Sequence, residues 1–188
     1  ILADVRARGD AALRDWTRRI DGLDLDELAI PPEALKRARA ALDPALVQDL
    51  EAAAGRIRAF HAHQPIASWT THELGGTLGQ RVTALERVGV YVPGGTAPLP
   101  SSLLMTVIPA RVAGVDEVVV CTPPGRPDGA VPDVILAAAD VAGADRVFRL
   151  GGAQAIAAMA YGTASVPRVD KIVGAGGLFT TLAKRQVF

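Results

Sequence analysis

The chain has 188 residues, and its 20 basic and 20 acidic side chains balance to a net charge of zero. A hydrophobic fraction of 49% is enough for a buried core, and the basic residues form no cluster, which argues against nucleic acid or an anionic membrane as a partner. No apolar run approaches the roughly 20 residues that a membrane-spanning helix needs. The single cysteine, Cys121, excludes an intrachain disulfide and fits a reducing, cytoplasmic setting.

The first 66 residues are predicted to form a helical segment. Gly9 marks a break between helices, and Asp10 stands where an N-terminal cap would begin the next helix. Pro32 opens a further helix, and Asp43 caps another one whose first residue is Pro44. Two of these helices have apolar residues at helical spacing, which predicts one face in contact with a core. The faces consist of Leu13, Trp16 and Ile20 in the first, and of Leu46, Leu50, Ala53, Ile57 and Phe60 in the second.

Residues 67–87 form a second segment, in which the pattern changes from helix to strand. Threonine and valine occur on both sides of Gly75 and Gly76, between Trp69 and Leu85. Apolar and β-branched residues flanking a glycine pair are typical of two strands joined by a tight turn. The sequence therefore predicts a β-hairpin that connects the helical segment to the rest of the chain.

From residue 88 to residue 188, apolar strands and helices alternate. Four consecutive strand–helix units predict a parallel sheet covered by helices on both faces, with right-handed crossovers. The predicted strands are Val88–Val92, Glu117–Cys121, Arg146–Leu150 and Lys171–Val173, and the helices that follow them are Ser102–Ala113, Pro132–Ala142, Ala153–Tyr161 and Leu178–Val187. The predicted fold class is thus α/β, a Rossmann-like parallel sheet with flanking helices, preceded by the helical segment and the hairpin. We expect three units accordingly, 1–66, 67–87 and 88–188, of which the last need not be a complete Rossmann-like domain.

Four loops leave the carboxyl ends of the predicted strands, where ligands of open parallel sheets bind. Each loop is rich in glycine or proline: Tyr91–Ser102, Thr122–Arg126, Gly151–Gln154 and Gly174–Gly177. In the first loop, the turn Pro93–Gly95 precedes a helix, so its backbone N–H groups and the helix dipole can face a phosphate. Any α/β sheet also needs glycine at such turns, so the spacing alone predicts a binding edge without fixing the ligand.

Two side chains at this edge offer specific chemistry. The amide of Gln154 suits a nicotinamide carboxamide or a ribose hydroxyl, but the spacing alone favours an exposed helix-start glutamine without a ligand. Cys121 could form a covalent thiohemiacetal, although no base is placed beside it, and a buried inert thiol is the alternative. His61 and His63 are two residues apart and would point about 200° apart on a helix, so they cannot share a metal ion.

Five long strings of the sequence are distinctive in type and in order: Val5–Thr17, Phe60–Gln64, Glu86–Gly114 (ERVGVYVPGGTAPLPSSLLMTVIPARVAG), Leu150–Ala164 (LGGAQAIAAMAYGTA) and Val166–Phe188 (VPRVDKIVGAGGLFTTLAKRQVF). These strings closely resemble the histidinol dehydrogenase family. The resemblance covers essentially the whole chain, because the segments match in order as well as in type. The resemblance implies an NAD-dependent, zinc-requiring oxidoreductase that converts L-histidinol to L-histidine in two steps through histidinal, at the end of histidine biosynthesis. It also implies an intertwined homodimer in the cytoplasm.

The resemblance further implies which residues bind the cofactor. Tyr91 and Gln154 occupy the positions at which members of the family contact NAD. A third contact of the family, the asparagine of a Gly-Pro-Gly-Asn turn, corresponds to Gly177, which lacks the amide. The family's zinc ligands and acid–base pair lie C-terminal to Phe188, so no residue of this chain is assigned as catalytic or as a metal ligand. Because the family's proteins are more than twice as long, we expect an internal fragment that is inactive by itself.

Two alternatives remain open at this stage. The first is an NAD-dependent oxidoreductase of the aldehyde dehydrogenase kind, which would use Cys121 as its nucleophile. The second is a catalytically silent folded module that only dimerises or binds a nucleotide. Zinc content and NAD turnover with histidinol would discriminate between these alternatives and the histidinol dehydrogenase interpretation.

Overall fold

The structure is a computed structural model that describes residues 1–65, 67–94 and 97–188. The strands of its central sheet are β1 (Ala29–Ile30), β4 (Arg87–Tyr91), β5 (Glu117–Thr122), β6 (Arg146–Arg149) and β7 (Lys171–Val173). They lie in the order β1-β6-β5-β4-β7. The four longer strands pair in parallel, and β1 pairs antiparallel with β6 at one edge. This arrangement confirms the predicted α/β fold with a parallel sheet, to which β1 adds a strand that the sequence pattern did not predict.

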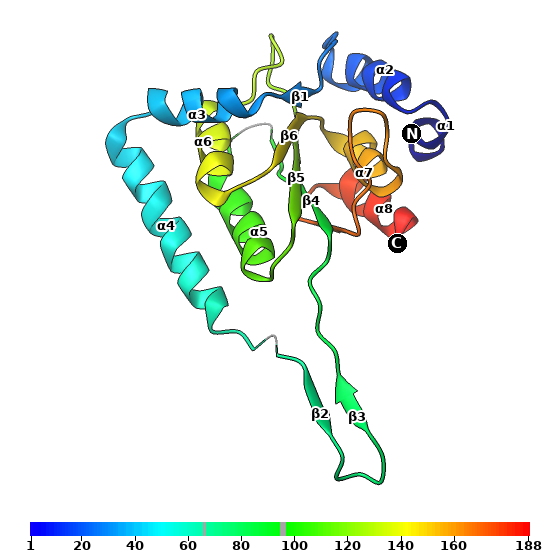
Figure 1. The fold of residues 1–188 in the computed structure, drawn as a ribbon. Helices are drawn as coiled ribbons and strands as arrows, with labels where there is room; N and C mark the ends of the chain where they lie inside the picture. The colour runs from blue at the N-terminus through cyan, green and yellow to red at the C-terminus, as the bar shows by residue number, and fades with distance from the viewer. Residues whose placement is uncertain (66, 95–96) are drawn as a thin grey trace.

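Helices cover both faces of the sheet (Figure 1). One layer consists of α3 (Pro32–Ala41), α4 (Pro44–Ala62), α5 (Pro100–Val112) and α6 (Asp133–Ala142), and the other of α1 (Leu2–Arg8), α2 (Asp10–Asp21), α7 (Gly152–Tyr161) and α8 (Leu178–Val187). Successive side chains of a strand point to opposite faces, so Val90 packs under the first layer and Tyr91 under the second. Because both faces are buried there, β4 and β5 are apolar without alternation between Val88 and Tyr91 and between Val118 and Cys121, as expected for a parallel sheet.

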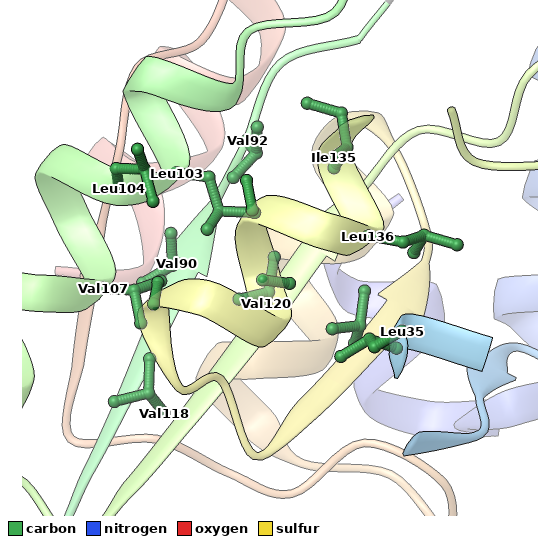
Figure 2. Packing of buried hydrophobic residues seen from close by; sticks show 14 of the residues in the cluster. Leu35, Val90, Val92, Leu103, Leu104, Val107, Val118, Val120, Ile135 and Leu136 are labelled. Atoms are coloured by element: carbon green, nitrogen blue, oxygen red, sulfur yellow. The ribbon is translucent and has the colours of Figure 1, made fainter. Parts of the chain in front are cut away.

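The core under the first layer joins the sheet to four helices. Figure 2 shows Val90 and Val120 of the sheet beside Val107 of α5, with Ile135 and Leu136 of α6 in the same cluster. All five are buried. Full burial of one such side chain contributes about 1.5–3 kcal/mol, so this cluster is a main source of the stability that holds the strand ends in place.

The apolar faces predicted for α2 and α4 are only partly buried. Leu13 and Leu50 lie in the core, but Ile20 is 45% exposed and Phe60 is 67% exposed. The prediction is also wrong for Leu46, which is exposed. The reason is length: α4 has 19 residues, whereas its partners α5 and α6 have 13 and 10, so both ends of α4 extend past the contact. The spacing of apolar residues predicts that a helix has an apolar face, but it does not predict where the helices packed against that face end.

The predicted hairpin is confirmed. Strands β2 (Trp69–Thr71) and β3 (Leu78–Gln80) pair antiparallel, and the hairpin projects away from the sheet (Figure 1). Its side chains are largely exposed, including Trp69. The division into units 1–66, 67–87 and 88–188 stays a prediction, and the first of these units contributes β1 to the sheet and helices to both of its faces.

One glycine allows the carboxyl ends of β4 and β7 to meet. Gly174 follows β7 with a φ of 105°, and a Cβ atom there would overlap the carbonyl oxygen of Tyr91. A side chain at this position would therefore meet both backbone strain and a backbone clash.

We expect Gly174→Ala to lower the free energy of unfolding by about 2–4 kcal/mol because of that strain and clash. The matched control is Gly55→Ala within α4, where a Cβ atom meets nothing within 4 Å. This control should raise the free energy of unfolding by about 0.5–1 kcal/mol because alanine favours helix. Urea unfolding measures both, and equal effects of the two substitutions would contradict the close approach at Gly174.

Candidate functional site at the carboxyl edge of the sheet

The order of the strands puts the switch point of the sheet between β4 and β7. From β4 the chain proceeds to β5 and β6 on one side, and it then returns to β7 on the other side of β4. The helices that follow β4 and β7, α5 and α8, therefore cover opposite faces of the sheet. Ligands of open α/β sheets bind at such a switch point, beyond the carboxyl ends of the strands. Of the turn predicted at Pro93–Gly95, the structure describes Pro93 and Gly94, while Gly95 lies outside the described residues.

The loops after β4, β5 and β6 meet at Pro123. A Cβ atom on Gly94 would lie 3.3 Å from Pro123, and one on Gly151 would lie 3.0 Å from it. Glycine at both positions thus lets the two turns approach the proline ring. Beside this contact is a cavity of about 550 Å³. It is lined by Asp21, Pro93, Gly94, Pro98, Thr122, Pro123, Pro124, Gly125, Arg126, Pro132 and Ile135.

The structure brings the two predicted cofactor residues, Tyr91 and Gln154, together at Gly152. The hydroxyl oxygen of Tyr91 accepts a hydrogen bond of 3.1 Å from the backbone N–H of Gly152. Gly152 has a φ of 59°, and a Cβ atom there would lie 2.8 Å from Oε1 of Gln154. Burial raises the pKa of Tyr91, and the hydrogen bond with Gly152 opposes that rise. Both side chains therefore flank the first turn of α7.

Gln154 is fully buried, with 0% of its surface exposed, so the interpretation as an exposed helix-start glutamine is wrong. Neither its Oε1 nor its Nε2 has a hydrogen-bond partner among the described residues. A buried polar group without a partner costs about 1–3 kcal/mol. An amide held at that cost, with both a donor and an acceptor free, is a candidate contact for a ligand. Its role in binding a cofactor stays a prediction.

Two side chains of α8 donate hydrogen bonds to the turn Gly174–Gly177. Nζ of Lys184 donates a hydrogen bond of 2.5 Å to the carbonyl oxygen of Gly174, and burial lowers the pKa of this lysine. The hydroxyl of Thr180 donates to the carbonyl oxygen of Gly177 over 2.8 Å. Gly177 itself has a φ of −74°, and a Cβ atom there meets nothing within 4 Å. A larger side chain therefore fits at Gly177 without strain.

Cys121 has the properties of a structural thiol. It is fully buried, and burial raises the pKa of its thiol to about 12. The thiolate is the nucleophilic form, and at neutral pH this environment keeps the thiol protonated. The geometry thus disfavours the alternative in which Cys121 attacks an aldehyde.

His61 and His72 make local contacts and do not converge on a shared site. Nδ1 of His61 lies 2.6 Å from Oε1 of Gln64, and Nδ1 of His72 lies 3.1 Å from the hydroxyl of Thr77 in the hairpin. In residues 1–65, 67–94 and 97–188, no three histidine, cysteine or acidic side chains gather as a metal site would require. Within the same ranges, no helix is both long and apolar enough to cross a bilayer.

Asp21 is a residue of this edge that the sequence reasoning missed. It is the last residue of α2, it lines the cavity beside Pro123, and its buried Oδ2 has no hydrogen-bond partner among the described residues. Burial raises the pKa of its carboxyl group, and the charge of Arg126 opposes the rise. A signal was present in the sequence, because an acid at the C-terminus of a helix opposes the helix dipole.

A parallel sheet with glycine turns at its switch point places the chain among Rossmann-like α/β proteins. The family model described as histidinol dehydrogenase matches residues 1–188, and the chain therefore belongs to the histidinol dehydrogenase family. This result confirms the resemblance of the sequence strings.

Named relatives agree with this assignment. Histidinol dehydrogenase of Methanosarcina barkeri is 54% identical over 189 residues, which is 100% of this chain and 43% of the relative. The enzyme of Deinococcus radiodurans is 57% identical over 188 residues, or 42% of its length. A crystal structure of histidinol dehydrogenase from Elizabethkingia anophelis superposes with a TM-score of 0.93 at 33% identity, covering 99% of this chain and 43% of that one. The chain thus spans less than half the length of these relatives.

We expect Gln154→Met to raise the free energy of unfolding by about 1–3 kcal/mol, because it removes two unpaired buried polar atoms at similar volume. Gln48→Met, at an exposed position of α4, is the matched control and should leave stability within about 0.5 kcal/mol. Urea unfolding of parent and variants measures the difference. A loss of stability in Gln154→Met would mean that the amide is paired in the folded protein.

The raised pKa of Asp21 makes the stability of the protein depend on pH. The unfolded chain releases the proton of Asp21 near the ordinary value of 3.8, whereas the folded protein, with its raised pKa, releases it at higher pH. The folded state thus binds more protons between these two values, so Asp21 lowers stability as the pH rises through them. Below pH 3.8 the penalty is absent, and above the folded pKa it is complete.

Asp21→Asn should therefore stabilise the protein more at pH 7 than at pH 3, relative to the parent. Urea unfolding at both pH values gives the comparison, with Asp26→Asn, an exposed neighbour in the chain, as the control for loss of a charge. A stability gain that is the same at both pH values would show that the carboxyl of Asp21 is not desolvated.

Proposed function

We propose that this chain forms the NAD-binding part of a histidinol dehydrogenase, which oxidises L-histidinol to L-histidine in two NAD-dependent steps through histidinal. Membership of the family over all 188 residues supports the proposal. The observation that carries it for the site is the buried, unpaired amide of Gln154 beside Tyr91 at the switch point of the sheet. NAD, when bound, supplies the hydride acceptor for each oxidation.

The residues at the edge suit NAD chemically. The amide of Gln154 can both donate to and accept from a carboxamide, or it can bind a ribose hydroxyl. The hydroxyl of Tyr91 accepts the N–H of Gly152 and keeps its own proton for a ligand oxygen. Because both side chains are buried, cofactor contact requires the turn at Gly151–Gly152 to open, and glycine permits such a change of backbone angles.

Zinc belongs to the proposed enzyme but not to the described residues, which hold no group of metal-ligating side chains. The relatives extend far beyond the region that this chain matches. We place the zinc ligands and the acid–base pair of the family in that additional sequence. No residue of this chain is assigned a catalytic or metal-binding role.

We further propose a cytoplasmic homodimer that acts on a small molecule and binds neither nucleic acid nor a membrane. Large apolar side chains are exposed on α8 and the hairpin, among them Leu178, Phe179, Trp69 and Leu74, and surfaces of this kind suit a subunit interface. The balanced charge and the buried thiol of Cys121 are consistent with this setting. A catalytically silent module remains the competing function, and NAD titration separates the two.

Calorimetric titration of NAD into the chain tests the proposal. The parent should bind NAD, and Gln154→Met should weaken binding about tenfold or more, because it removes the amide that pairs with the cofactor. Gln48→Met is again the matched control and should bind as the parent does. No binding by the folded parent would contradict the proposed function, and unchanged affinity in Gln154→Met would remove Gln154 from the site.

The same titration tests the Gly174–Gly177 turn. Gly177→Asn restores the amide that the family resemblance implies, and the open space at this position admits it. We expect NAD to bind about two- to tenfold more tightly, for a net hydrogen-bond gain of roughly 0.5–1.5 kcal/mol. Gly177→Ala controls for the backbone change alone. Equal affinities of the two variants would mean that this turn does not contact the cofactor.

A further inference from the structure

The cavity at the carboxyl edge contains an acidic side chain from outside the strand–helix units. Asp21 comes from α2, yet it lines the cavity with Gly94 after β4, with Thr122 at the end of β5 and with Pro123 after it. Its buried Oδ2 accepts no hydrogen bond from the described residues. A buried carboxylate oxygen without a partner is costly, so its place in the wall of a cavity points to a ligand that donates to it.

The β5 end of the sheet lacks the acid that a dinucleotide fold commonly places there. In such folds an acidic residue after the second strand of the unit accepts hydrogen bonds from ribose hydroxyls. Here β5 is the second strand, and Thr122 is followed by Pro-Pro-Gly-Arg, which includes no acid. Nη2 of Arg126, the last residue of that run, donates a hydrogen bond of 3.0 Å to the carbonyl oxygen of Ile20. This contact ties the β5 loop to the residue before Asp21.

Charge at this position distinguishes the two nicotinamide dinucleotides. A carboxylate accepts hydrogen bonds from the 2′-hydroxyl of NAD, whereas it repels the 2′-phosphate of NADP. Arg126 is the cation of the same cavity wall, and it would attract the phosphate once the neighbouring charge was removed. The balance between these two side chains therefore sets which cofactor the cavity favours.

We propose that Asp21 binds the adenosine ribose of the cofactor through its hydroxyls and makes the site select NAD over NADP. This role rests on the proposed NAD-binding function and adds a residue of α2 to the site. In this arrangement α2 completes the site by supplying the acid that the β5 loop lacks.

Calorimetric titrations of NAD and NADP into the parent chain, Asp21→Asn and Asp26→Asn test the proposal. The parent should prefer NAD at least tenfold. Asp21→Asn should bind NAD about tenfold more weakly and NADP more tightly than the parent, because it loses the charged acceptor and the repulsion together. Asp26→Asn removes an exposed charge of the same sign nearby and should leave both affinities unchanged.

The outcomes separate this role from the proposed function. No NAD binding by the parent would contradict the function itself. NAD binding by the parent, with the same preference in Asp21→Asn, would overturn the role of Asp21 alone. Asp21→Ser provides a second variant with a smaller side chain if the asparagine variant does not fold, and parent-like preference in it would overturn the role equally. In the Asp21→Asn background, Arg126→Ala should abolish the gain in NADP affinity.

Discussion

The close approach of the loops that leave β4, β5, β6 and β7 is the constraint on which the carboxyl edge depends. Gly174 passes so near the carbonyl oxygen of Tyr91 that no side chain fits, and Gly151 packs against the ring of Pro123. Because these contacts bring the loops together, the hydroxyl of Tyr91 can accept a hydrogen bond from the N–H of Gly152 at the start of α7. The two core clusters on either face of the sheet then hold the strand ends in register.

Among the described residues, three side chains of α2 and α7 carry buried polar atoms without a hydrogen-bond partner: Gln154, Asp21 and Thr17. Natural proteins pair nearly all such groups, and exceptions cluster at functional sites. Gln154 and Asp21 lie at the carboxyl edge, where a ligand could supply the partners that the chain lacks. Apolar residues at these two positions would make the folded protein more stable. The presence of polar side chains there is therefore consistent with a site organised for binding.

Local pattern was enough to predict the parallel sheet and the hairpin. The strand Val118–Val120 is apolar without alternation because both faces are buried, and this property is visible in the sequence. In contrast, β1 has two residues and exists only because Ala29 and Ile30 pair with Phe148 and Val147 far along the chain. A short pairing of this kind leaves no periodic signal.

Some residues of the candidate site could likewise be predicted from the sequence, and others could not. The position of Gln154 at the start of a helix was predicted from Gly151 and Gly152. Its complete burial was not predicted, because it depends on packing between the helix layer and the sheet, which the spacing of residues along a helix does not indicate. Asp21 was missed because it is distant in sequence from the four loops predicted at the carboxyl edge, and it reaches the cavity only through the docking of α2. The family resemblance identified Tyr91 and Gln154 as candidates, and it offered no indication of Asp21.

A crystal structure of the chain with NAD is the sharpest test of the proposed cofactor site. We expect the cofactor at the carboxyl edge, with the amide of Gln154 hydrogen-bonded to it and a ribose hydroxyl within hydrogen-bonding distance of Asp21. NAD bound elsewhere on the molecule, or a bound cofactor that leaves the amide of Gln154 buried and unpaired, would contradict this site.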